Sequence, residues 1–67
     1  MNYDQVGLVI AVTRIKSGIS QEELARRSGI SQADICKLES GKHNTTVKTL
    51  KRLAKAMGKR LDISFVD

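Results

Sequence analysis

Cysteine, histidine and proline are nearly absent from this chain of 67 residues, which has one cysteine, one histidine and no proline. Because Cys36 has no second cysteine to pair with, a disulfide within the chain is excluded. Cys36 and His43 alone are too few for a thiolate and imidazole metal site, so we expect no metal and no other cofactor. A domain this small then depends on a well-packed core, a partner chain, or both.

Long apolar runs and linker-like segments are lacking as well. No segment is long and apolar enough to span a bilayer, and the first residues, 1–4, lack the basic start of a secretory signal. Together with the single thiol, this favours the cytoplasm. No low-complexity run divides the chain, so we expect residues 1–67 to form a single domain.

The sequence also lacks the combinations of residues that enzymes use for catalysis. The sequence offers no paired carboxylates, no metal cluster, and no nucleophile with a base at a usable spacing. A chain of this length leaves no volume for a substrate pocket. We therefore expect a protein that is not an enzyme.

Positive charge is what the chain has in excess. Lysine and arginine number 12 against 7 acidic residues, which gives a net charge of +5, and residues 37–60 contain a single acid, Glu39. A positive field attracts polyanions and speeds their capture. Small basic domains also carry lysines that are merely solvated, so the charge by itself leaves both interpretations open.

Two helices are expected in the first half of the chain. The first spans about residues 3–16, with Asp4 near its positive end and Gly18 as its stop. Ser20 followed by Glu23 is the capping-box pattern, in which the hydroxyl and the carboxylate each bind a free backbone N–H. A short second helix therefore starts there.

Two further helices are expected in the second half. Ser31 is the predicted cap of the third helix, which runs to about Ser40. Thr46 is the predicted cap of the fourth, over residues 47–57, whose apolar residues recur at helical spacing. They are Val47, Leu50, Leu53, Ala54 and Met57.

The second and third helices are separated by a turn of about three residues around Gly29, which can adopt the left-handed conformation of a tight helix exit. The small Ala25 lets the two helices cross closely, and Ile35 and Leu38 supply apolar contacts at the crossing. This arrangement over about residues 20–40 predicts a helix-turn-helix, which presents its second helix to a DNA major groove.

The run ISQEELARRSGISQADICKLESGK, residues 19–42, resembles the lambda-repressor-like helix-turn-helix of the Xre family of bacterial and phage regulators. The resemblance covers residues 10–58, with Thr13 and Thr45 as departures from the usual aliphatic residue and proline. It implies a mainly α fold, a four-helix bundle. The shared positions are Gln21, Leu24, Ala25, Gly29, Ile35, Leu38, Glu39 and Gly41.

The third helix carries side chains that can contact base edges on the face opposite Ile35 and Leu38. Gln32 can pair with adenine, Lys37 can donate to guanine, and the Ala33 methyl group can touch a thymine methyl group. Ser31 lies beside them at the start of the helix. The alternative is an ordinary solvated helix face.

Two further regions are expected to contact the DNA backbone. The resemblance implies that Gln21 and the start of the second helix meet a phosphate. The polar loop after the third helix is the other expected contact, although an exposed imidazole without any contact is an equal alternative for His43. The loop residues are Ser40, Lys42, His43 and Asn44.

The resemblance also implies a salt bridge between the first and third helices, formed by Arg14 and Glu39. Its expected role is to orient the third helix. Arg14 could instead lean on a phosphate.

The tail, Arg60 to Val66, alternates apolar and polar residues as a half-buried strand does. Because a lone strand cannot satisfy its backbone groups, we expect it to pair with the same segment of a second copy. Its apolar side chains would then cover a second apolar stripe on the first helix. The tail residues are Leu61, Ile63 and Phe65, and the stripe is Leu8, Val12 and Ile15. A frayed tail or a fifth helix is the alternative.

Residues 44–67 resemble the HipB-type antitoxins, Xre-family proteins whose C-terminal strand pairs across a dimer, and more loosely the HigA type. The sequence therefore leaves two interpretations of the function open. The first is a homodimeric transcriptional regulator, a repressor that binds a palindromic operator in double-stranded DNA and is nucleoid-associated when bound. The second is the antitoxin of a type II toxin–antitoxin pair, which neutralises a cognate toxin protein and represses its own operon.

Overall fold

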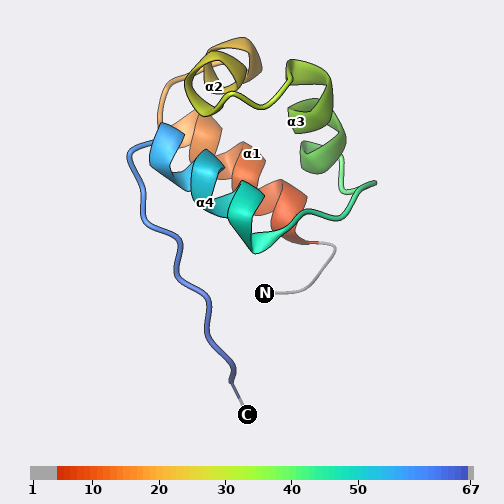
Figure 1. The fold of residues 1–67 in the computed structure, drawn as a ribbon, viewed down its shortest axis with the longest axis vertical. Coiled ribbons are helices and arrows are strands. Elements are labelled where there is room, and N and C mark those ends of the chain that lie inside the picture. The colour runs from red at the N-terminus through yellow and green to blue at the C-terminus, as the bar shows by residue number, and fades with distance from the viewer. Residues whose placement is uncertain (1–4, 67) are drawn as a thin grey trace.

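The computed structural model describes residues 5–66, which form four helices joined by short turns (Figure 1). The helices are α1 (Val6–Lys16), α2 (Gln21–Ser28), α3 (Gln32–Glu39) and α4 (Val47–Ala56). This confirms the predicted mainly α fold and its four helices. The expected start of the first helix, including Asp4, lies outside the described residues. None of the four helices is both long and apolar enough to cross a membrane.

The helices α2, α3 and α4 are each capped at their start by a side-chain hydroxyl group. Ser20 Oγ accepts a hydrogen bond from the Glu23 N–H at 3.0 Å. The Ser31 hydroxyl caps α3 and the Thr46 hydroxyl caps α4, each at 3.1 Å from a backbone nitrogen three residues on. Each bond satisfies a backbone donor that the first turn of a helix leaves without a partner. The three predicted caps are therefore present.

The second half of the predicted capping box at α2 is wrong. The Glu23 carboxylate accepts hydrogen bonds from Arg26 and Arg27, one turn further along α2, rather than from the backbone at Ser20. Both partners are charged in the pairs with arginine, and two guanidinium groups offer more donors than one backbone N–H. The hydrogen bonds to Arg26 and Arg27 also hold the pKa of Glu23 below its usual value.

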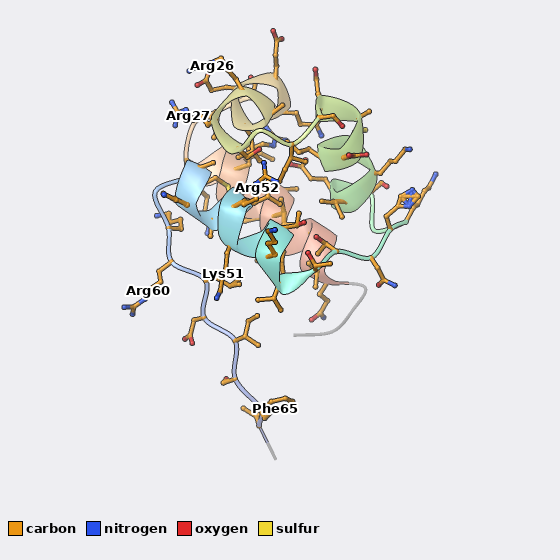
Figure 2. All side chains as sticks on the ribbon, in the orientation of Figure 1. Arg26, Arg27, Lys51, Arg52, Arg60 and Phe65 are labelled. Atoms are coloured by element: carbon orange, nitrogen blue, oxygen red, sulfur yellow. The ribbon has the colours of Figure 1, made fainter. Side chains whose placement is uncertain are left out.

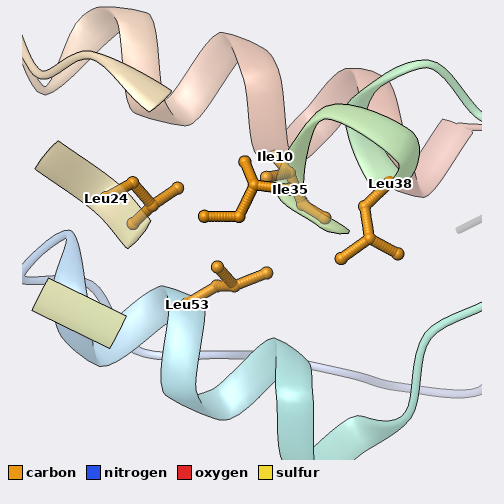
Figure 3. Close-up of a cluster of buried hydrophobic side chains, with 5 residues drawn as sticks. All are labelled: Ile10, Leu24, Ile35, Leu38 and Leu53. Carbon is orange, nitrogen blue, oxygen red and sulfur yellow. The ribbon is translucent and has the colours of Figure 1, made fainter. Parts of the chain in front are cut away.

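Five buried side chains, one or two from each helix, form the core (Figure 3). They are Ile10, Leu24, Ile35, Leu38 and Leu53. The two that come from α3, Ile35 and Leu38, fix which side of this helix faces inward. Val47, which shares the apolar spacing of α4, is an exception because its side chain is 51% exposed at the start of that helix.

Helix α1 passes very close to the end of α3 at Gly7. A Cβ atom on Gly7 would overlap the carbonyl oxygen of Leu38 and would lie 3.1 Å from the backbone nitrogen of Gly41. Both neighbours are backbone atoms, which cannot swing aside as a flexible side chain can. Glycine at this position therefore sets the distance between α1 and the end of α3.

The tail leaves the bundle without regular structure over residues 59–66 (Figure 1). The prediction of a β-strand over Arg60 to Val66 is therefore wrong for the single chain. The physical reason is that a strand needs a neighbouring strand, and residues 5–66 of one copy contain none. Leu61 is half-buried at the edge of an apolar hollow between α1 and α4, whereas Ile63 and Phe65 are exposed.

Candidate nucleic-acid interface

The outward side of α3 carries the predicted base-reading residues. Ser31, Gln32, Ala33 and Lys37 are all exposed, whereas Ile35 and Leu38 on the opposite side are buried. The helix begins with the Ser31 cap, so Ser31 and Gln32 lie beside its free backbone N–H groups, and Lys37 lies in its last turn. The structure thus brings these four residues together on a rigid, solvent-facing element.

The loop after α3 continues this surface. Ser40, Lys42, His43 and Asn44 are exposed, and the Ser40 hydroxyl donates to the carbonyl oxygen of Lys37 at 2.7 Å. An open groove of about 450 Å³ runs between α3, this loop and the start of α4. Its lining includes Ser31, Lys37, His43, Asn44 and Arg52. Predicted base-reading and backbone-contacting residues therefore lie on one continuous surface.

The predicted ion pair between Arg14 and Glu39 is present and joins α1 to the last residue of α3. Arg14 Nε lies 2.7 Å from Glu39 Oε2, and Arg14 Nη2 lies 3.0 Å from Oε1. The two side chains are only 14% and 7% exposed. Arg14 Nη1 donates to the carbonyl oxygen of Ile19 at 2.9 Å. Each of the three guanidinium nitrogens therefore donates one hydrogen bond within the protein, which holds Arg14 between α1, the end of α3 and Ile19.

Gln21 belongs to the same network. Its side-chain nitrogen donates to Glu39 Oε1 at 3.0 Å, which ties the start of α2 to the end of α3. The amide is thus turned toward Glu39, and the free N–H groups at the start of α2 remain for a phosphate. The contact between Gln21 and DNA stays a prediction.

The ion pair changes the ionisation of both partners. Burial raises the pKa of Glu39, but hydrogen bonds from Arg14 and Gln21 and the positive charge of Arg14 outweigh it, so the pKa lies below its usual value. The hydrogen bond with Glu39 raises the pKa of Arg14. The folded state therefore favours the charged form of Glu39, and this preference is a source of stability.

The contribution of Glu39 to stability is expected to disappear in acid. Because its pKa is lower in the folded state than in the unfolded chain, the contribution is full above the unfolded value of about 4.3 and is lost as pH falls through the folded value. We expect Glu39→Gln to lower the free energy of unfolding by about 1–3 kcal/mol at neutral pH and by much less at acid pH. Urea unfolding at pH 7 and at pH 3 measures the difference.

Glu22→Gln is the matched control for that measurement, since Glu22 is an exposed acid on α2. We expect this control to change the free energy of unfolding little at either pH. An effect of Glu39→Gln that is equally large at both pH values would contradict the role given to its charge.

One polar contact near this surface has no signal in the sequence pattern. Arg52 of α4, which is labelled in Figure 2, donates from Nη2 to the carbonyl oxygen of Ser28 at 2.9 Å, across 24 positions of the chain. The sequence places Arg52 in a stripe of general surface charges with Lys48 and Lys55. Only the packing of α4 against α2 and the turn after it reveals the partner.

The second apolar stripe of α1 is solvent-exposed. Leu8, Val12 and Ile15 are 62%, 40% and 64% exposed. Phe65 of the tail is fully exposed (Figure 2). The stripe therefore lies outside the core of the single chain, and its contact with the tail of a second copy stays a prediction.

Comparisons with known proteins agree with this geometry. The HTH_3 helix-turn-helix family model matches residues 10–63. The HTH-type transcriptional regulator y4dJ of Sinorhizobium fredii is 47% identical over 53 residues, which cover 79% of this chain and 69% of y4dJ. An HTH-type transcriptional regulator of Archaeoglobus fulgidus is 34% identical over 53 residues, covering 79% of this chain and 76% of the relative.

Two solved restriction-modification controller proteins have the same fold. C.Esp1396I, crystallised as a tetramer in complex with its natural 35 base-pair operator, superimposes with a TM-score of 0.81 at 30% identity, covering 85% of this chain and 75% of that one. C.AhdI from Aeromonas hydrophila gives a TM-score of 0.81 at 28% identity, covering 87% and 88%. With its family match and its helix-turn-helix geometry, the chain belongs to the HTH_3 helix-turn-helix family, the Xre-like class that residues 19–42 resemble.

Proposed function

We propose that this protein is a DNA-binding transcriptional regulator, a repressor that places α3 in the major groove of double-stranded DNA. The observation that carries the proposal is the exposed face of α3, where Gln32, Ala33 and Lys37 face solvent while Ile35 and Leu38 on the opposite side are buried in the core. Amide, methyl and ammonium groups on one helix face suit the donors, acceptors and methyl groups of base edges.

Phosphate contacts near the end of α3 would hold this helix in the groove. The loop residues Ser40, Lys42, His43 and Asn44 lie beyond the end of α3, and the capped start of α2 lies near that same end because Gln21 binds Glu39. Free N–H groups, hydroxyls and a lysine are the groups that bind phosphate oxygens in protein–DNA complexes. The names of the regulator relatives and the operator complex of C.Esp1396I support the proposal.

We propose further that the regulator acts as a homodimer on a palindromic operator. The exposed apolar stripe of α1 and the exposed apolar side chains of the tail are surfaces that a second copy would cover. A two-fold symmetric protein presents two reading helices, which matches half-sites about one helical turn, or ~34 Å, apart. The proposed protein has no catalytic activity, and it works in the cytoplasm on the nucleoid.

The test is selection of bound sequences from a pool of random duplexes, combined with the mass of the protein in solution. We expect the selected sequences to contain a two-fold symmetric site and the mass to be that of two chains. A pool without any enriched sequence would overturn the regulator proposal. A monomer mass, both free and on DNA, would overturn the dimer.

The antitoxin alternative now depends on the resemblance of residues 44–67 alone. The strand expected over 60–66, which suggested the HipB type, is absent from the single chain. Purification of the tagged protein from its own host tests this alternative directly. Equimolar recovery of a second protein whose toxicity it blocks would establish it.

A further inference from the structure

A hydrogen bond from Arg52 of α4 adds to the packing of α4 against α2 and reaches the turn between α2 and α3. Arg52 Nη2 donates to the carbonyl oxygen of Ser28, the last residue of α2, at 2.9 Å. The last carbonyl groups of a helix have no partner within it and carry the negative end of its dipole. A guanidinium suits both features, because it is a permanent positive charge with several donors.

The same turn is also held from within. Ser28 is buried, and its Oγ accepts a hydrogen bond from the backbone N–H of Ile30 at 3.2 Å. Gly29 adopts the left-handed conformation with φ of 73°, and its N–H donates to the carbonyl oxygen of Ala25 at 3.0 Å. These hydrogen bonds hold the residues of the turn together. The contact with Arg52 therefore positions the whole turn relative to α4.

Gly29 leaves room for this contact. A Cβ atom on Gly29 would lie 2.8 Å from Arg52 Nη2. Gly58 has nearly the same backbone conformation, with φ of 69°, but nothing lies within 4 Å of the place where its Cβ would be. A side chain at Gly58 meets only the backbone penalty, whereas one at Gly29 also meets the guanidinium.

The two ends of α3 are thus held by different contacts. Glu39 at its end is bound by Arg14 of α1 and Gln21 of α2. The turn before its start is bound by Arg52 of α4. Three of the exposed base-reading residues, Ser31, Gln32 and Ala33, belong to the start of α3, the end nearest the Arg52 contact, whereas Lys37 lies in its last turn.

We propose that Arg52 is a positioning residue for DNA recognition, which sets the direction of α3 by holding the α2–α3 turn against α4, and that Gly29 keeps the space its guanidinium occupies. The proposal rests on the proposed function, in which α3 reads base edges. If α3 points in the wrong direction, its side chains lose their contacts with base edges. Contacts with phosphates are affected less, because they do not depend on the base sequence. Loss of Arg52 should therefore reduce the preference for the operator more than the affinity for DNA in general.

The competing explanation is that Arg52 is only a surface charge or a phosphate contact, and a matched pair of variants separates the two. Arg52→Gln and Lys51→Gln each remove one positive charge from neighbouring exposed positions of α4. Dissociation constants are measured for the selected operator and for a scrambled duplex over a range of salt concentrations. Circular dichroism confirms that each variant is folded.

We expect Lys51→Gln to lower the affinity of the protein for both duplexes by a similar factor. Arg52→Gln should in addition lower the ratio of operator to scrambled affinity by about tenfold, with the same salt dependence as Lys51→Gln. A reduced salt slope with an unchanged ratio would show that Arg52 is a phosphate contact and would overturn the proposal. If the unaltered protein prefers no sequence, the proposed function fails, and the role of Arg52 in recognition fails with it.

A second measurement, made without DNA, tests the contact itself. Gly29→Ala and Gly58→Ala are compared by urea unfolding, each in the natural chain and in the Arg52→Gln variant. We expect Gly29→Ala to lower the unfolding midpoint more than Gly58→Ala, and we expect this excess to vanish when Arg52 is absent. Equal losses at the two glycines, or an excess that persists without Arg52, would show that the guanidinium does not occupy this space.

Discussion

Gly7→Ala is expected to destabilise the folded chain by about 3 kcal/mol or more, the upper part of the range for overpacked sites. The added methyl group would overlap the carbonyl oxygen of Leu38, and α1 could make room only by moving away from the end of α3. Alanine is the better helix former by about 1 kcal/mol, but that gain is smaller than the cost of the overlap. In a domain of 67 residues this loss removes most of the stability.

Urea unfolding followed by circular dichroism measures this change. Lys16→Ala, at the exposed end of the same helix, is the control, and we expect it to stay within about 0.5 kcal/mol of the natural chain. If Gly7→Ala is as stable as the natural chain, then α1 and α3 do not approach each other as the structure describes. The destabilised packing would also affect the proposed DNA-binding surface, because the backbone at Gly41, in the loop after α3, lies against Gly7.

Affinity for the operator is expected to fall steeply with salt. A protein that neutralises 6–10 phosphates loses about 10³-fold to 10⁵-fold in affinity between 50 and 200 mM salt, because it releases the counterions that the phosphates had bound. The net charge of +5 per chain and the exposed Lys37 and Lys42 beside α3 place a homodimer in this class. The slope of log Kd against log salt concentration gives the number of phosphates contacted.

Two lysine variants show whether that slope arises at the proposed surface. Lys42→Gln removes a charge from the loop after α3, and we expect the slope to fall by about one for each copy bound. Lys59→Gln removes a charge beyond the end of α4, beside the apolar hollow between α1 and α4 rather than the groove along α3, and should leave the slope unchanged. Binding that is insensitive to salt would exclude this mode of DNA binding.

Local patterns in the sequence were sufficient to predict the four helices and the hydroxyl caps of α2, α3 and α4. The hydroxyl of Ser31 caps a nitrogen only three residues away, so neighbouring residues determine the bond. Helical spacing likewise identified Ile35 and Leu38 as buried, which in turn identified the outward face of α3. The pair of Arg14 and Glu39 came from the resemblance to a known family and not from spacing, because it joins residues 25 positions apart.

Contacts between distant residues and contacts between copies could not be predicted in this way. The hydrogen bond from Arg52 to Ser28 and the close approach at Gly7 depend on how the helices pack, which no local pattern encodes. The prediction of a strand in the tail was wrong for a different reason. Its alternation is typical of a strand, but a strand forms only where a neighbour pairs with it, and the single chain supplies no neighbour within residues 5–66.

The central claim is that the outward face of α3 reads DNA sequence, and the random-duplex selection run in parallel with the natural chain and Gln32→Ala tests it most directly. Because Gln32 is exposed, the variant should unfold at the same urea concentration as the natural chain. We predict that the natural chain selects a two-fold symmetric site and that Gln32→Ala selects the same site with its preference lost at one base pair in each half. Identical base preferences in the two selections, or no preference in either, would contradict the account.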